Sequence, residues 1–235
     1  MMRIMVINPN SSQEMTASIC EVLERVKRSD TELTVVRTVG APAAIQSASD
    51  IAQAVPPLLE LVRKANKQGY NAVILACFSD PGLEAAREQS EILVMGIEET
   101  ALHVAAMLGH KYTILTPLSK RIPSKEQDVR RFKAESAMAS VRALDLTVTE
   151  TESNPELTKA RILEVARKAV QEDGAEVIVL GCAGMTGYAN DVEQQLGVVV
   201  LDPTTVTLKV CEGLIDAGLR HCKRALYAKV SPNDA

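Results

Sequence analysis

Two cysteines stand in matching places, one in each half of the chain. Cys77 lies in the string Ala-Cys-Phe-Ser-Asp-Pro-Gly and Cys182 in the string Gly-Cys-Ala-Gly-Met, and each string follows a run of apolar, mostly β-branched residues. A free thiol ionises near about pH 8.5, so both its protonation states are accessible close to neutral pH. Two thiols that face each other across a crevice could remove a proton from one face of a carbon atom and return it to the other.

The apolar runs before the two cysteines predict buried strands that end just before each thiol. Open parallel sheets form their binding crevices at the carboxyl ends of the strands, so we expect both thiols at such a rim. A single cysteine at a strand end is more often a small buried hydrophobe. The symmetric placement, with turn-forming Gly or Pro-Gly after each thiol, favours a catalytic pair. Cys20, Cys211 and Cys222 lack this context and are expected to be packing residues.

The order of elements before each cysteine repeats between the two halves of the sequence. Segment 59–77 holds a helical pattern, a glycine and an apolar run that ends in a thiol, and segment 163–182 repeats this order with one residue inserted. Segment 4–9 matches 112–117 in the same way, and 93–96 matches 199–202. Because a whole domain is repeated, the pattern indicates a duplicated fold and not a solenoid.

Apolar strands that alternate with helices indicate parallel sheets covered by helices on both faces. We therefore predict an α/β fold with two α/β/α domains, each built on a parallel four-stranded sheet. The first would cover 1–98 and be completed by 206–235, and the second would cover 99–205. The strands are expected over 3–8, 32–37, 71–77, 92–95, 111–115, 144–149, 176–180 and 198–201. The charged stretch 120–133 is expected to be a solvated helix, with a lid as the less favoured alternative.

Composition excludes several partners. The net charge is −4, Trp is absent and aromatic residues make up 3% of the chain. Base stacking and phosphate binding therefore lack their usual residues, and nucleic acid is not an expected partner. No apolar run approaches the roughly 20 residues that a membrane span needs. We expect a cytoplasmic protein with reduced cysteines and, as for most metabolic enzymes, a homo-oligomer.

Metal and nucleotide motifs are missing as well. The thiols lack Cys-x-x-Cys spacing, and His103, His110 and His221 fall at no ligand interval, so no metal site is expected. The glycines of 181–187 lack the Gly-x-Gly start of a dinucleotide loop. No cofactor is therefore predicted.

Four motifs carry a resemblance to a known family: Ile-Asn-Pro-Asn-Ser after the first expected strand, the two cysteine strings after the third and seventh, and Leu-Asp-Pro after the eighth. With these motifs the chain resembles, over nearly its whole length, the hydantoin and allantoin racemases of the aspartate/glutamate/hydantoin racemase superfamily. The resemblance implies two domains related by pseudo-two-fold symmetry, an active site in the cleft between them, and cofactor-independent racemisation of a small-molecule substrate by paired cysteines.

The same resemblance implies roles for individual residues. Cys77 and Cys182 would be the two bases, and Asn8, Ser79, Thr116, Ala183 and Gly184 would line the substrate pocket. Ile45 lies in a loop expected to contact the substituent of the substrate ring, and Phe78 follows the first thiol. Backbone N–H groups of 183–185, up to Met185, would cradle an enolate oxygen. Pro81 and Gly82 would open a helix whose N-terminal amides favour a thiolate at Cys77.

The expected substrate is a 5-substituted hydantoin or allantoin. Neither cysteine loop contains Arg or Lys, and Asp80 would repel an anion, which favours a neutral ring. Hydantoin racemases usually carry Ile-Glu-Gly where this chain has Ile45-Gln46-Ser47, so the sequence does not predict which substituent the substrate ring carries. The alternatives are an aspartate/glutamate-type amino-acid racemase, which a basic residue reaching the pocket from elsewhere would support, a cis-trans isomerase, and a non-catalytic small-molecule binding protein.

Overall fold

Two four-stranded parallel sheets with the same strand order form the framework. The computed structural model describes residues 1–229. The first sheet has the order β2-β1-β3-β4 and the second the order β6-β5-β7-β8, with every described strand pair parallel. The strands are β1 (Met2–Asn8), β2 (Thr31–Arg37), β3 (Ala72–Leu75), β4 (Leu93–Gly96), β5 (Tyr112–Thr116), β6 (Met138–Ala143), β7 (Val177–Leu180) and β8 (Val199–Leu201). The repeated order confirms the duplicated α/β fold.

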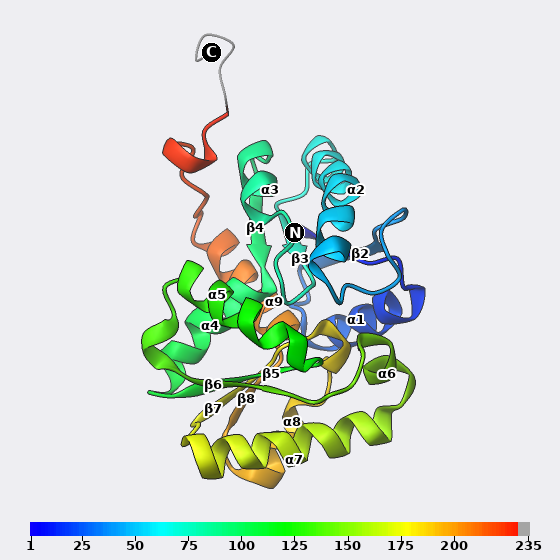
Figure 1. Ribbon diagram of the computed structural model, residues 1–235. Helices are drawn as coiled ribbons and strands as arrows, with labels where there is room; N and C mark the ends of the chain where they lie inside the picture. Colours follow the sequence, from blue (N-terminus) through cyan, green and yellow to red (C-terminus); the bar gives the residue numbers. More distant parts are fainter. Residues whose placement is uncertain (230–235) are drawn as a thin grey trace.

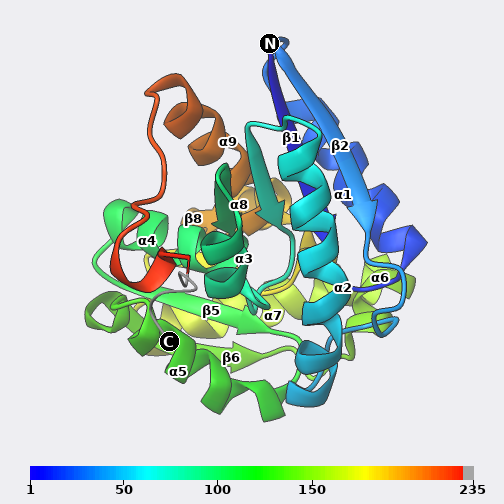
Figure 2. The same cartoon turned by 90° about the horizontal axis from the view of Figure 1, so that it is seen from above.

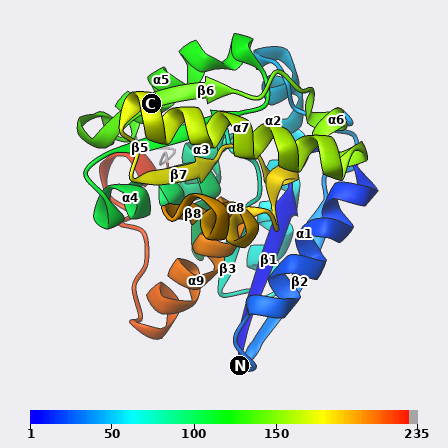
Figure 3. The same cartoon turned by 90° about the horizontal axis from the view of Figure 1, so that it is seen from below.

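Helices form three layers around the two sheets (Figure 1). They are α1 (Gln13–Val26), α2 (Ala48–Lys67), α3 (Leu83–Gln89), α4 (Ile97–Leu108), α5 (Ile122–Arg131), α6 (Val148–Ser153), α7 (Pro155–Asp173), α8 (Ala189–Leu196) and α9 (Pro203–Asp216). Seen from above, α2 and α3 lie on the outer side of the first sheet (Figure 2). Seen from below, α7 and α8 lie on the outer side of the second (Figure 3). Helices α1, α4 and α9 lie between the two sheets.

The inner helices belong to one continuous core that joins both halves. Ile4 and Ile74 from the first sheet and Ile114 and Val179 from the second lie in the same cluster of buried side chains, together with residues of α1, α4 and α9. The four residues of β3 and of β7 are each 0% exposed. Strands covered on both faces need continuous apolar runs, which is why Ala-Val-Ile-Leu and Val-Ile-Val-Leu precede the cysteines.

One expected strand is wrong. The sequence prediction placed a strand over 144–149, whereas β6 covers Met138–Ala143 and residue 148 already begins α6. The apolar and β-branched letters of 144–149 suggested a strand, but Thr147 accepts a hydrogen bond from the Glu150 amide, and the Glu150 carboxylate accepts from the Thr147 amide. This capping box starts a helix. The true strand, Met-Ala-Ser-Val-Arg-Ala, lies at the sheet edge with every residue partly exposed.

The proposed domain boundaries, 1–98 with 206–235 and 99–205, stay a prediction, and residues 230–235 lie outside the described part of the chain. Helix α9 does return to the first half. Glu212 on α9 accepts hydrogen bonds from the Thr31 hydroxyl at 2.7 Å and from the Arg28 amide at 2.9 Å. Among helices within residues 1–229, none is both long and apolar enough to span a bilayer.

Candidate active site

The fold brings the carboxyl ends of four strands to one place. In each sheet the chain winds outward in opposite directions from the two central strands, β1 and β3 or β5 and β7, and such a switch point leaves a crevice beyond the strand ends. Cys77 lies two residues after the end of β3, and Cys182 two residues after the end of β7. The duplicated topology therefore supplies one thiol from each half.

Both thiols line the same cavity, which is partly open to solvent. The walls come from both halves of the chain. They consist of Asn10, Met15, Ile45, Gln46, Ala76, Cys77, Phe78 and Ser79 from the first half, and Thr116, Pro117, Leu118, Arg121, Lys125, Val148, Gly181, Cys182 and Ala183 from the second.

Five expected pocket residues lie in this wall beside the cysteines, namely Ile45, Phe78, Ser79, Thr116 and Ala183. Three others do not line it. Asn8 is buried and donates from its amide nitrogen to Asn10 Oδ1 at 2.7 Å, so it holds a residue that does line the cavity. Gly184 lines a separate neighbouring hollow, and Met185 is fully buried in the core beneath α7 and α8.

The turn after Cys182 directs a backbone amide at the sulfur. Residues Ala183–Met185 form a 3₁₀ turn, and the Gly184 N–H donates to Cys182 Sγ at 3.3 Å. A side chain at position 184 would lie 3.0 Å from the Thr151 hydroxyl, and one at position 181 would lie 2.5 Å from the Leu115 carbonyl oxygen. Glycine at these two positions therefore lets the turn form. An amide expected to cradle an enolate oxygen points instead at the thiol.

The turn after Cys77 is built differently. The amides of Ser79 and Asp80 both donate to the Cys77 carbonyl oxygen, at 2.8 and 3.0 Å. Helix α3 begins only at Leu83, after Gly82 in the left-handed conformation. No hydrogen bond to the Cys77 sulfur occurs among the contacts of residues 1–229. The start of α3 therefore does not supply the amide donors that were expected to favour a Cys77 thiolate.

Burial dominates the ionisation of both thiols. Burial and, second, the neighbouring Cys182 sulfur raise the pKa of Cys77 to about 12. Burial raises the pKa of Cys182 to about 11, while the Gly184 amide opposes this rise. The positive charge of Lys125 lowers the pKa of both groups. Burial therefore favours the neutral form of both thiols.

A buried ammonium group lies beside the first cysteine loop. Lys125 on α5 is 1% exposed, and its Nζ donates to Glu98 at 2.7 Å, to Asp128 at 2.9 Å and to the Phe78 carbonyl at 2.6 Å. The expectation that 120–133 is a solvated helix is thus wrong along this face, where Lys125 and Val129 are buried. Their four-residue spacing puts both on the same side of α5.

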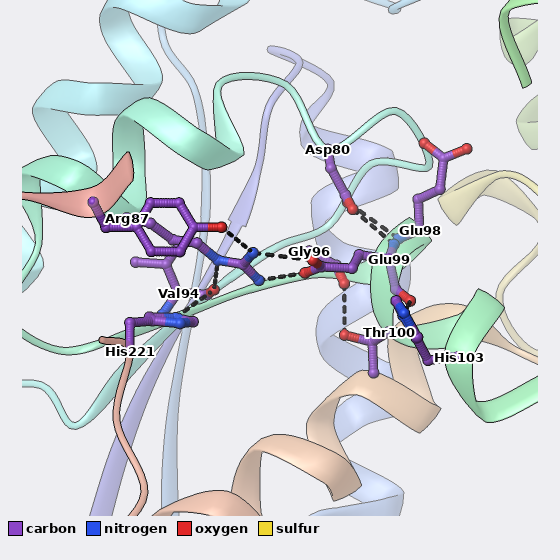
Figure 4. A network of polar contacts seen from close by, with 10 residues as sticks. Asp80, Arg87, Val94, Gly96, Glu98, Glu99, Thr100, His103 and His221 are labelled. Carbon is purple, nitrogen blue, oxygen red and sulfur yellow. Dashed lines mark hydrogen bonds and ion pairs between the residues drawn. The ribbon is translucent and has the colours of Figure 1, made fainter. Parts of the chain in front are cut away.

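Asp80 does not face the cavity. Its carboxylate is buried and accepts the amides of Glu98 and Glu99 at 3.1 and 2.8 Å, at the start of α4 (Figure 4). Gly96 leaves room for it, because a Cβ there would lie 2.3 Å from the carboxyl group. Burial raises the pKa of Asp80 to about 7, against the two amides. The expected repulsion of an anionic substrate therefore loses its structural basis.

A second set of contacts fixes the start of α4 to the C-terminal segment (Figure 4). Arg87 pairs with Glu99 and donates from Nε to the Val94 carbonyl at 3.1 Å. The Val94 amide donates to His221 Nε2 at 2.9 Å, and Arg87 also donates to the Tyr227 hydroxyl at 3.2 Å. The segment after α9 thus braces the strand and helix that hold Asp80.

The sequence analysis missed Arg121. It ends a 3₁₀ turn that follows β5, lines the cavity, and donates from Nη2 to the Ser79 hydroxyl at 3.3 Å. The cysteine loops themselves contain no Arg or Lys, but this loop delivers a guanidinium group to the same wall. The motif alignment of 4–9 with 112–117 was the available signal, since it places the loop after β5 at the same rim as Asn10.

Within residues 1–229, no three His, Cys, Asp or Glu side chains are arranged to hold a metal ion. Cys211 is buried, as expected of a packing residue, whereas Cys20 is partly exposed and Cys222 exposed.

Comparison with known proteins assigns the chain to a class. Residues 4–211 match the sequence profile of the family described as Asp/Glu/Hydantoin racemase, and the chain belongs to this family. Hydantoin racemases are among its similar relatives. The hydantoin racemase of Rhizobium meliloti is 38% identical to this chain, and the match covers 97% of this chain and 94% of the relative. The hydantoin racemase of a Pseudomonas species is 34% identical, and the match covers 96% of this chain and 91% of the relative. The chain is therefore an isomerase of the racemase type.

Solved structures agree with this assignment. Allantoin racemase from Klebsiella pneumoniae superposes with a TM-score of 0.95 at 33% identity, covering 98% of this chain and 94% of that one. A crystal structure of arylmalonate decarboxylase, with a TM-score of 0.64 at 17% identity over 93% and 94% of the two chains, shares the fold alone.

Proposed function

We propose that this chain is a cofactor-independent racemase of 5-substituted hydantoins or allantoin in which Cys77 and Cys182 act as two bases. The observation that carries the proposal is that two free thiols, one from each half of a duplicated fold, line the same cavity. Relatives named hydantoin racemase, at 34–38% identity over nearly the full chain, support the substrate class.

The chemistry fits a pair of thiols. The stereogenic C–H of a 5-substituted hydantoin lies beside a carbonyl group, so loss of its proton gives an enolate whose charge moves to oxygen. One sulfur, as thiolate, takes the proton and becomes a thiol. The other, as thiol, delivers its own proton to the opposite face of the carbon and becomes a thiolate. The bound enantiomer decides which sulfur must start as the anion.

Other residues have supporting roles in this proposal. Asn10, Ser79 and Thr116 offer polar groups to the ring amide and carbonyl groups, with Asn8 orienting Asn10. Gly184 stabilises the Cys182 thiolate through its amide, and the buried Met185 anchors that turn. Ile45, Phe78 and Ala183 supply apolar wall.

An amino-acid racemase is the second candidate, because Arg121 reaches the cavity and a guanidinium group is a natural partner of a carboxylate. The cytoplasmic location and the homo-oligomer stay predictions of the sequence, and analytical ultracentrifugation tests the latter.

The test is racemisation by purified protein, dialysed against chelator and without added cofactor. Single enantiomers of several 5-substituted hydantoins, allantoin, L-aspartate and L-glutamate are followed by circular dichroism beside protein-free controls, since hydantoins also racemise slowly in buffer. We expect accelerated signal loss with a hydantoin or allantoin. Acceleration with L-aspartate or L-glutamate alone would favour an amino-acid racemase. If none of the test compounds racemises faster than in the protein-free control, the racemase proposal fails and a non-catalytic binding protein becomes the favoured alternative.

A further inference from the structure

Arg121 is a charged group in the cavity wall that racemisation itself does not use. It is partly buried, and its described side-chain contact is the hydrogen bond to the Ser79 hydroxyl at 3.3 Å. Among residues 1–229, no carboxylate forms an ion pair with it. A guanidinium group presents five N–H donors in a planar fork, so most of its hydrogen-bonding capacity faces the cavity and solvent.

Three poorly exposed cations of the chain are neutralised by carboxylates within the fold. Lys125 pairs with Glu98 and Asp128, and Arg87 pairs with Glu99. Arg142 pairs with Glu172 and Asp173. Arg121 differs from these cations because its charge has no such structural partner on the described surface.

The surroundings of Arg121 suit an anionic group on a bound ligand. Pro117 and Leu118 line the same cavity and add apolar surface to its wall, and a charged hydrogen bond is stronger in less polar surroundings. The nearby acids are engaged elsewhere, since Asp80 accepts amides of α4 and Asp128 pairs with Lys125. Ser79, which contacts Arg121, lies two residues after Cys77, so a group held here is close to the reacting carbon.

We propose that Arg121 selects substrates whose ring substituent ends in a carboxylate, so that hydantoins derived from acidic amino acids are preferred. The inference rests on the proposed function and adds to it the charge of the side chain. Arg121 is a specificity residue in this account: it would bind the end of the substituent and take no part in proton transfer.

The test compares two substrates of equal shape. The hydantoins derived from glutamate and from glutamine differ only in a carboxylate against a carboxamide, and the leucine-derived hydantoin reports activity without a polar substituent. We expect kcat/KM for the glutamate-derived hydantoin to exceed that for the glutamine-derived one by at least about tenfold, the least that a charged hydrogen bond usually supplies. In Arg121→Gln the ratio of the two kcat/KM values should fall to about one, mainly because KM for the glutamate-derived hydantoin rises.

Arg130→Gln is the matched control, because it removes the same charge from the exposed side of α5, where the one ion-pair partner of Arg130 among residues 1–229 is Glu126. It should keep the ratio. A readout that needs no variant is added salt, which should weaken turnover of the glutamate-derived substrate more than that of the glutamine-derived one.

The outcomes separate the two proposals. A wild-type protein that racemises the leucine-derived hydantoin but shows no preference for the carboxylate would overturn the role of Arg121 and leave the racemase proposal standing. A preference that survives in Arg121→Gln would overturn it as well. If the wild-type protein racemises none of the three hydantoins, the proposed function fails, and the substrate preference fails with it.

Discussion

The Lys125 ammonium group donates a hydrogen bond to the Phe78 carbonyl oxygen at 2.6 Å, so a buried charge on α5 holds the residue directly after Cys77. The same group pairs with Glu98 on α4 at 2.7 Å. Both the first cysteine loop and α4 are thereby tied to the helix that follows β5. A positive charge in this position also favours the ionised form of either thiol.

Replacing Lys125 by Met should destabilise the fold and raise the pKa of both thiols. The Glu98 carboxylate would be left buried without its partner, which costs about 3–5 kcal/mol. Urea unfolding measures this loss, and the ultraviolet absorbance of thiolate during a pH titration measures the ionisation. The double variant Lys125→Met/Glu98→Gln should recover much of the lost stability. Equal thiol titration in the wild-type and Lys125→Met proteins would show that the charge of Lys125 has no such effect.

The activity should rise with pH through the neutral range. Burial raises the pKa of Cys77 to about 12 and of Cys182 to about 11, so the productive pair of one thiolate and one thiol is scarce at neutral pH. Since the thiolate fraction grows as pH approaches the lower of these values, kcat/KM should increase by about tenfold per pH unit between about pH 7 and pH 9. A substrate methylated at the ring nitrogen removes the substrate's own titration. A flat profile would contradict the two-thiol mechanism.

Gly96→Ala should disturb the Asp80 loop. The added Cβ would lie 2.3 Å from the Asp80 carboxyl group, so we expect a loss of about 1–3 kcal/mol in thermal or urea unfolding. Gly213→Ala is the control, because Gly213 lies within α9 with nothing within 4 Å of the new Cβ. Alanine is the better helix former, so this variant should gain about 0.5–1 kcal/mol. If both variants changed stability alike, steric conflict at Asp80 would not be the cause.

Much of the fold was accessible from the sequence because the two halves repeat each other. The all-buried strands β3 and β7 appear as continuous apolar runs, and each ends just before a cysteine, so the position of the thiols at a sheet rim could be predicted. Strand β6 could not, because an edge strand that is partly exposed throughout needs no apolar pattern. The helix that starts at Val148 was hidden by β-branched letters that a capping box overrides.

The charges of the site were the part that sequence reasoning could not place. Arg121 and Lys125 lie more than forty residues from Cys77, and only the packing of α5 against the first cysteine loop brings them to it. Asp80 was the opposite case. It is near Cys77 in sequence, yet the start of α4 turns its carboxylate away from the cavity. Nearness along the chain was therefore a poor guide to the electrostatics of the pocket.

The most direct test of the two-base account is racemisation in D₂O with single cysteine variants. The wild-type protein should convert either enantiomer of a hydantoin substrate and place deuterium at the stereogenic carbon. Cys77→Ser and Cys182→Ser should each lose racemisation by at least about a hundredfold, while hydrogen exchange survives for opposite enantiomers in the two variants. Cys222→Ser, at an exposed position outside the cavity, should behave as wild type. Racemisation at the wild-type rate by either of the first two variants would contradict the account.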